Sequence, residues 1–199
     1  MYNKEEIDKA LKTLNEGGIL LYPTDTVWGL GCDACNPEAV AKIFEIKKRS
    51  DSKSLVLLAS DLDMVARFVK EIPEMAVQLV EVNDKPMTII YPGAVVSASD
   101  VFDKHALAAN TVAEDGSVGI RIPMMDFCVS LVRRFGRPIV STSANISGEA
   151  TPKKFAEISE VIRNAADYIV DPSLENGSTG TSSSIIKVGT DASIQIIRK

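Results

Sequence analysis

The sequence is poor in cysteine and histidine, and this scarcity narrows the chemistry open to it. Its 199 residues include three cysteines and one histidine, His105. Cys32 and Cys35 form a Cys-x-x-Cys pair, which occurs in redox centres and in halves of zinc sites. Cys128 and His105 are the remaining partners for a tetrahedral site, and neither lies at zinc-finger spacing. The pair also sits in a glycine-rich loop rather than opening a helix after a strand. We interpret the cysteines as small buried side chains in a reducing compartment.

Long hydrophobic runs are missing as well. The longest, such as residues 19–22 and 55–59, are far too short to cross a bilayer. The first residues lack the basic and then apolar layout of a signal peptide. A content of 45% hydrophobic and 25% charged residues is that of an ordinary globular protein, not of a collagen-like, disordered or coiled-coil chain. We expect a single cytoplasmic domain over residues 1–199, with no membrane partner.

Positive charge is in deficit, since 22 lysines and arginines face 27 acidic residues and the net charge is −5. Proteins that mainly grip a nucleic-acid backbone are usually basic, so the overall charge argues against that role. The basic residues are nevertheless clustered, at residues 42–53 and 133–137. A local basic pocket is therefore compatible with the acidic total.

Hydrophobic periodicity and capping residues predict an α/β fold. Asn3 with Glu6 opens a helix that Gly17 and Gly18 end, and Pro37 opens another. Further helices are expected at residues 61–70, 73–82, 125–135 and 151–165. Strands are expected at residues 19–22, 55–58, 87–91, 118–122, 138–142, 168–170, 184–188 and 194–197. Because these elements do not alternate strictly, we expect a twisted mixed β-sheet flanked by helices.

Four polar segments are candidates for a ligand site. Residues 23–31 follow a buried strand and carry hydroxyls, a carboxylate and glycines, although a hydroxyl-stabilised turn would also explain them. Residues 47–53 hold four cations with hydroxyls between them, which suits a triphosphate or simply a helix C-terminus. Residues 118–123 end a strand in an arginine, which suits a carboxylate ligand or an internal ion pair. Residues 138–148 run from an apolar strand into a row of hydroxyls and an amide, more than a capping loop needs.

Phosphate-binding loops of the G-x-x-x-x-G-K-[ST] and G-x-G-x-x-G types are absent, and so is a G-x-S-x-G nucleophile elbow. A nucleotide would have to be held by side chains and by strand or loop backbone. Together the four segments predict a polar hollow rimmed with cations, suited to an anionic small molecule and without an evident nucleophile.

These four segments resemble the signature of the YrdC-like threonylcarbamoyl-AMP synthases. The matching stretches are residues 23–34 (PTDTVWGLGCDA), 47–55 (K-x-R-x-x-x-K-x-L), 117–123 (SVGIRIP) and 141–148 (STSANISG). The resemblance implies a twisted mixed sheet around a large positively charged cavity. It implies a nucleotidyltransferase that joins L-threonine, bicarbonate or CO2, and ATP into threonylcarbamoyl-AMP and pyrophosphate. A downstream tRNA threonylcarbamoyltransferase complex would use the product, and a weak contact with tRNA is compatible with the family.

The same resemblance implies roles for particular residues. The threonine-binding set would be Thr26, Arg121, Ser141 and Ser183. The ATP-binding set would be Arg49, Lys53, Ser117, Ser143, Asn145, Thr151 and Arg198. Charge stabilisation during the reaction would come from Lys47, Arg49 and Lys53. No protein residue would act as a metal ligand, because Mg²⁺ would arrive with ATP.

The sequence departs from the family pattern at three places. Trp28 stands where a tyrosine or phenylalanine is usual, and Leu58 stands where some members have a histidine near threonine. A Pro-Gly-Pro-x-Thr segment is reduced to residues 84–88 (DKPMT). Two alternatives stay open. The first is an RNA-binding module for tRNA or double-stranded RNA, which the acidic net charge disfavours. The second is a carbamoyltransferase-type domain, which is disfavoured because the regions that accompany such a domain in larger carbamoyltransferases are not found in this sequence.

Overall fold

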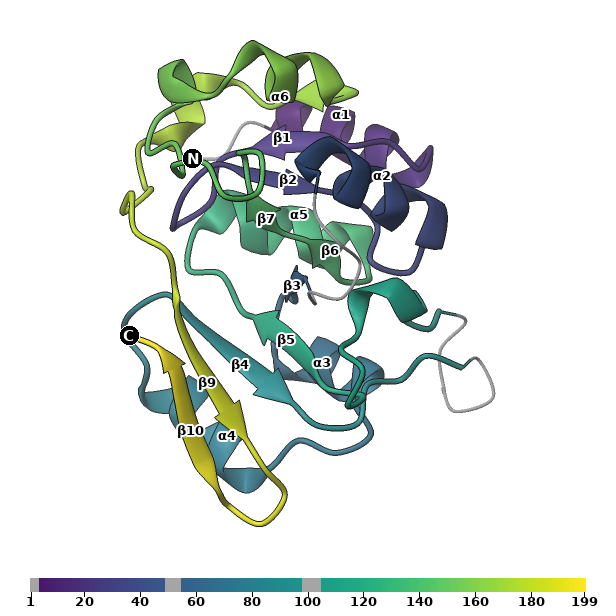
Figure 1. Cartoon of the computed structure of the whole chain (residues 1–199), viewed down its shortest axis with the longest axis vertical. Helices are drawn as coiled ribbons and strands as arrows, with labels where there is room; N and C mark the ends of the chain where they lie inside the picture. Colours follow the sequence, from purple (N-terminus) through teal and green to yellow (C-terminus); the bar gives the residue numbers. More distant parts are fainter. Residues whose placement is uncertain (1–3, 49–54, 98–104) are drawn as a thin grey trace.

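The fold is built on two mixed β-sheets (Figure 1). The computed structural model describes residues 4–48, 55–97 and 105–199. The four-stranded sheet has the order β7-β2-β1-β8, and the six-stranded sheet has the order β10-β9-β4-β5-β3-β6. The strands of the first sheet are β1 (Leu20–Tyr22), β2 (Gly29–Gly31), β7 (Thr142–Ser143) and β8 (Tyr168–Ile169). Those of the second are β3 (Val56–Leu58), β4 (Met87–Tyr91), β5 (Val118–Arg121), β6 (Ile139–Val140), β9 (Ser184–Val188) and β10 (Ile194–Arg198).

Each sheet combines parallel and antiparallel pairs. In the first sheet, β1 runs antiparallel to β2 and parallel to β8. In the second, β3 runs parallel to β5 and antiparallel to β6, and β4 runs antiparallel to β5 and parallel to β9. The expected α/β class with twisted mixed sheets is therefore confirmed, although the strands are divided between two sheets.

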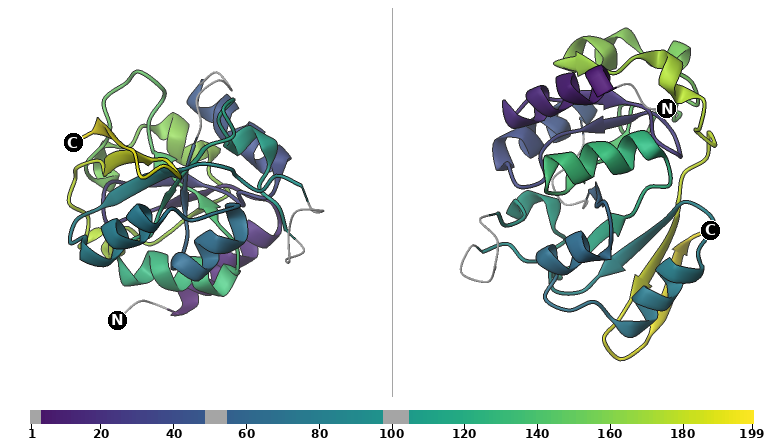
Figure 2. Two further views of the ribbon diagram at one scale, coloured as in Figure 1. Left: turned by 90° about the horizontal axis from the view of Figure 1, so that it is seen from below. Right: turned by 180° about the vertical axis from the view of Figure 1, so that it is seen from behind.

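Helices lie on the rear side of both sheets, as the view from behind shows (Figure 2). The two long helices α1 and α5 lie against each other behind the four-stranded sheet, and α3 and α4 lie behind the six-stranded sheet. The helices are α1 (Lys4–Asn15), α2 (Pro37–Lys47), α3 (Leu62–Phe68), α4 (Glu74–Val82), α5 (Asp126–Phe135) and α6 (Glu160–Ala165). Asn36 caps α2 as expected, since its side chain accepts a hydrogen bond from the Ala39 N–H at 3.0 Å.

Two expectations about the chain from residue 138 onward are wrong. The strand expected at residues 138–142 is divided: β6 belongs to the six-stranded sheet and β7 to the four-stranded sheet. The chain crosses between the sheets at Ser141, whose N–H donates to the Val56 carbonyl at 2.8 Å. The helix expected from residue 151 begins only at Glu160, after a 3-10 turn at Phe155–Glu157. The Phe155 N–H donates to the Glu175 carboxylate at 2.9 Å, which draws this backbone away from helical pairing.

Two of the three cysteines are buried, as the sequence predicts. Cys32 and Cys128 are buried and free of disulfides, and Cys35 is half-buried. Burial raises the pKa of both buried thiols, so they are protonated and unreactive at neutral pH. Over the described ranges, no three His, Cys, Asp or Glu side chains come together as a metal-binding group. In the same ranges, the helices are too short or too polar to span a bilayer.

Candidate active site

A polar cleft is lined by residues from both sheets. Its volume is ≈ 260 Å³, which approaches the range of about 300–1,000 Å³ that small-molecule sites occupy. The loop after β1 and the β6–β7 junction form one side, and β4, β5, β9 and the end of β10 form the other. Hydroxyl groups dominate the polar lining, from Thr24, Thr26, Thr88, Ser141, Thr142, Ser143, Ser182 and Ser183. Among the described lining residues, the charged ones are Arg121 and Arg198.

Many of the residues chosen from the sequence meet in this cleft. Those that line it are Thr26, Arg121, Ser141, Ser143, Ser183 and Arg198. The described residues Lys47, Ser117, Asn145 and Thr151 do not line it. Arg49 and Lys53 lie outside the described residues. The cleft is therefore lined by all four residues predicted to bind threonine and by Ser143 and Arg198 of the set predicted to bind ATP.

Arg121 is the most buried charge of the cleft, with 3% of its surface exposed. Its guanidinium makes a short ion pair with Asp25, which is itself 4% exposed. The other terminal nitrogen, Nη2, donates to the Thr26 hydroxyl at 3.4 Å. The second Asp25 oxygen accepts from the Met124 N–H at 3.1 Å. The internal ion pair expected as one explanation of this segment is therefore present, and the arginine at the end of β5 also lines the cleft.

The loop after β1 is stiffened by its own hydroxyls. Thr24 Oγ1 donates to the Val27 carbonyl at 2.7 Å and lies 2.8 Å from Thr26 Oγ1. Gly31 of the following strand β2 is required by close packing, because a Cβ there would lie 2.5 Å from the Val140 carbonyl oxygen. This segment is both a hydroxyl-stabilised turn and one wall of the cleft.

Ser183 links the other wall to the end of the chain. Its hydroxyl lies 2.8 Å from that of Thr88, which is fully buried in β4. Its carbonyl accepts from Arg198 Nε at 2.9 Å. Thr88 was not among the residues chosen from the sequence; the signal that pointed to it was the reduced Pro-x-Thr pattern at residues 86–88.

Lys47 braces the β7 loop instead of lining the cleft. The side chain is 2% exposed, and its ammonium donates to the carbonyls of Ser143 and Asn145, the latter at 2.6 Å. The Ser147 N–H donates back to the Lys47 carbonyl at 2.9 Å. Lys47 is thus placed to shape the loop that presents Ser143.

The remaining candidates lie around the cleft. The Ser117 hydroxyl donates to Asp115 at 2.6 Å, and hydrogen bonds from Lys187 and Ser117 hold the pKa of that carboxyl well below its usual range. Asn145 uses its amide N–H₂ on the Glu149 carbonyl at 2.8 Å, whereas its buried Oδ1 has no hydrogen-bond partner in the described part of the chain. Thr151 lies in the loop before the 3-10 turn.

Trp28 forms part of the cleft wall and is anchored from behind. Its Nε1 donates to Glu175 at 2.7 Å, and its ring lies 5.0 Å from that of Phe155. The same carboxylate oxygen accepts the Phe155 N–H.

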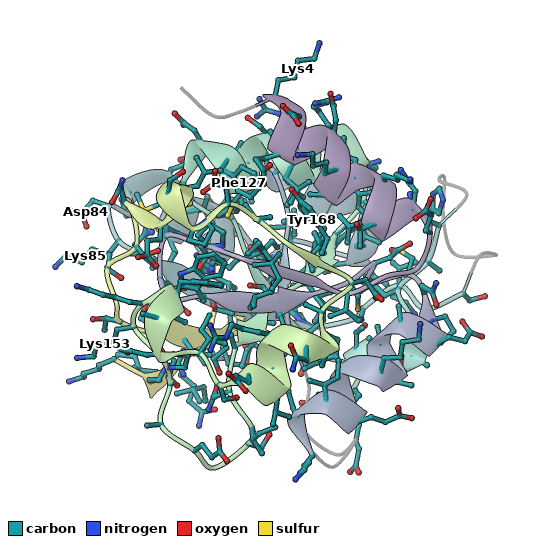
Figure 3. The ribbon with its side chains drawn as sticks, turned by 90° about the horizontal axis from the view of Figure 1, so that it is seen from above. Lys4, Asp84, Lys85, Phe127, Lys153 and Tyr168 are labelled. Carbon is teal, nitrogen blue, oxygen red and sulfur yellow. The ribbon has the colours of Figure 1, made fainter. Side chains whose placement is uncertain are left out.

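Leu58, by contrast, is fully buried beside Arg121 in the neighbouring strand and does not reach the cleft. Figure 3 shows Asp84, Lys85 and Lys153 pointing outward on one side of the molecule.

Comparisons with known proteins agree with this architecture. The model of the Sua5/YciO/YrdC family, described as "Telomere recombination", matches residues 12–199. The chain belongs to the Sua5/YciO/YrdC family. A relative from Xanthomonas euvesicatoria pv. vesicatoria (strain 85-10), named threonylcarbamoyl-AMP synthase, is 31% identical over 196 residues that cover 97% of each chain. That name denotes a transferase of the nucleotidyltransferase type, so the curated relatives are enzymes.

Solved structures show the same fold. The crystal structure of P. abyssi Sua5 complexed with L-threonine is 27% identical, with a TM-score of 0.77 and coverage of 94% of this chain. This chain spans 52% of that one, about half its length. E. coli YciO is 21% identical, with a TM-score of 0.80 and coverage of 100% of this chain and 91% of that one, a likeness of fold.

Proposed function

We propose that the protein is a threonylcarbamoyl-AMP synthase, which makes threonylcarbamoyl-AMP and pyrophosphate from L-threonine, bicarbonate or CO2, and ATP. The observation that carries the proposal is a buried arginine, Arg121, in a hydroxyl-lined cleft between two sheets. Support for the substrate comes from the name of the curated relatives and from the L-threonine in the P. abyssi Sua5 structure.

In this proposal, Arg121 binds the carboxylate of L-threonine. A guanidinium matches a carboxylate in both charge and planar geometry. Thr26, Ser141 and Ser183 line the same cleft and offer hydroxyls to the amine and hydroxyl of the substrate. Because hydroxyls both donate and accept, they can follow the amine as it becomes a carbamate.

In this proposal, the nucleotide binds at the side of the cleft that is lined by Ser143 and Arg198. Asn145 belongs to the same loop as Ser143, and its buried Oδ1 has no hydrogen-bond partner among the described residues. Ser117 and Thr151 would contribute from the periphery, and Arg49 and Lys53, which lie outside the described residues, would carry the charge of the phosphates. The described cleft residues supply hydroxyls and guanidinium groups rather than carboxylates, so Mg²⁺ would enter bound to the phosphate oxygens of ATP.

The reaction requires positioning and charge neutralisation more than a protein nucleophile. The threonine amine adds to CO2 and loses a proton, which gives a carbamate. A carbamate oxygen then bonds to the α-phosphorus of ATP as the bond to the β-phosphate oxygen breaks, and pyrophosphate leaves. Fixed cations and hydroxyls stabilise the charge on the transferred group. The product would serve a separate complex that transfers threonylcarbamoyl to tRNA.

A pyrophosphate-release assay tests the proposal. Release should require ATP, L-threonine and bicarbonate together, and equal release without threonine would refute the reaction. Arg121→Met should lower kcat/KM for threonine at least about tenfold, since a hydrogen bond to a charged group contributes about 1.5–3 kcal/mol. Arg137→Met is the matched control, because it breaks the partly buried pair of Arg137 with Asp33 (2.8 Å) away from the cleft.

A further inference from the structure

Asp25 joins the two walls of the cleft through its side chain. It follows β1 of the four-stranded sheet, whereas Arg121 ends β5 of the six-stranded sheet. One carboxylate oxygen accepts from Arg121, and the other accepts from the N–H of Met124, three residues further along the chain. With 4% of its surface exposed, this carboxylate is held between the walls rather than in solvent.

The bonds to Asp25 and Thr26 fix the orientation of the guanidinium. Arg121 donates a hydrogen bond from Nη1 to the Asp25 carboxylate and another from Nη2 to the Thr26 hydroxyl. Both terminal nitrogens of the guanidinium are therefore fixed by the loop after β1. A planar group held at two ends cannot rotate about its long axis without losing both contacts. The N–H groups that face the cleft are therefore presented in one plane.

The backbone of the same loop positions a second part of the site. The carbonyl of Asp25 accepts from the Thr179 N–H at 3.0 Å, and that of Thr26 accepts from the Gly180 N–H at 2.8 Å. These bonds hold the segment that leads to Ser183, and Figure 1 shows this segment passing along the outside from one sheet to the other. A change confined to the Asp25 side chain leaves these backbone bonds possible.

We propose that Asp25 is a positioning residue that selects a carboxylate-bearing substrate by orienting Arg121. The proposal rests on the proposed function for the identity of the substrate, and on the ion pair for its mechanism. Without the carboxylate, the Arg121 fork is free to rotate and loses its alignment with the ligand. Misplacement of a binding group by about 1 Å can cost about 100-fold in rate.

The test measures ligand binding apart from turnover. Trp28 is the single tryptophan of the chain and lines the cleft, so its fluorescence reports ligand binding. L-threonine and L-threoninol, which lacks the carboxylate, are titrated into the wild type and into Asp25→Asn. We expect Asp25→Asn to weaken threonine binding about 10- to 100-fold and to leave threoninol binding within about threefold. An unchanged ratio of the two affinities would overturn the proposal.

Asp33→Asn is the matched control. It also removes a mostly buried carboxylate from an arginine, Arg137, at 2.8 Å, but it lies outside the cleft lining. We expect this variant to lose stability and to keep the threonine-to-threoninol ratio of the wild type. A fall of the ratio in both variants would show that general loosening, not orientation of Arg121, is responsible.

The double variant Asp25→Asn/Arg121→Met keeps the test decisive if the single variant does not fold, because it leaves no buried charge unpaired. Compared with Arg121→Met alone, it should bind threonine equally well, and a further loss would mean that Asp25 acts independently of Arg121. Pyrophosphate release distinguishes a failure of the proposed reaction from a failure of the proposed role of Asp25. If the wild type prefers threonine over threoninol but releases no pyrophosphate, the proposed reaction fails while the role of Asp25 stands.

Discussion

Replacement of Lys47 by methionine tests whether this lysine acts on the reaction directly or through the β7 loop. The ammonium donates to the carbonyls of Ser143 and Asn145, and the side chain is 2% exposed. Methionine keeps most of the apolar stem and its packing, but it offers neither donor. The substitution therefore isolates the hydrogen bonds from the volume.

The size of the effect follows from those two hydrogen bonds. Each bond from a charged donor contributes about 1.5–3 kcal/mol, and the two carbonyls lose it together. Part of this loss is offset, because the variant no longer buries an ammonium at a cost of several kcal/mol. We expect a net loss of about 2 kcal/mol in the free energy of unfolding of Lys47→Met. For a chain of this length, that corresponds to a fall in Tm of about 4–8 °C.

The assay pairs urea denaturation with pyrophosphate release. Lys42→Met serves as the control, because Lys42 lies exposed on the same helix and should change stability by no more than about 0.5 kcal/mol. Ser143 lines the cleft, so a displaced loop should raise the KM for ATP more than that for threonine. If Lys47→Met were as stable as Lys42→Met and lost only kcat, the ammonium would act on the phosphates directly and the bracing role would be refuted.

Two further substitutions test the packing and the pH response of the scaffold. Gly31→Ala places a Cβ 2.5 Å from the Val140 carbonyl oxygen; we expect urea denaturation to show a loss of about 1–3 kcal/mol, and an unchanged midpoint would contradict the close packing. Burial alone would raise the pKa of Glu6. Hydrogen bonds, of which the one from Tyr168 is the largest, outweigh this effect and hold the pKa below its ordinary value. Tyr168 lies under α1 in Figure 3. A depressed carboxyl pKa stabilises the folded state above the unfolded value of about 4.3, so the stability gap between the wild type and Glu6→Gln should be full at pH 7 and shrink below pH of about 4. A gap independent of pH would show that Glu6 contributes only as a neutral acceptor.

Local signals in the sequence predict most of the fold. The capping residues and apolar spacing of residues 3–47 predict α1 and α2, and buried apolar runs predict β1, β3 and β4. The strand β2 was not expected, because Gly29–Gly31 has no strand signal of its own. It pairs on one side with the preceding strand β1 and on the other with β7, which is distant in sequence. A short strand of this kind is determined by tertiary packing, which local propensity does not describe.

The contents of the site were easier to predict than its internal contacts. Motifs and the family resemblance bring Thr26, Arg121 and Ser183 to one cleft, as the structure shows. The partner of Arg121 is 96 residues away in sequence, and no periodic pattern links positions at such a distance. Asp25 lies within the first polar segment, but the sequence around a carboxylate in a loop does not indicate which arginine forms an ion pair with it.

The overall charge of the chain says little about what the cleft attracts. The net charge of −5 counts many carboxylates on the outer surface, such as Glu5, Glu16 and Glu38, all of which are exposed. Exposed charges are screened within about 8 Å at physiological salt, whereas a charge in a cleft with low-dielectric walls is screened much less. The described residues of the cleft lining carry arginines and hydroxyls. An anionic ligand inside the cleft therefore meets the field of these few groups, and an acidic chain can hold a negatively charged substrate without contradiction.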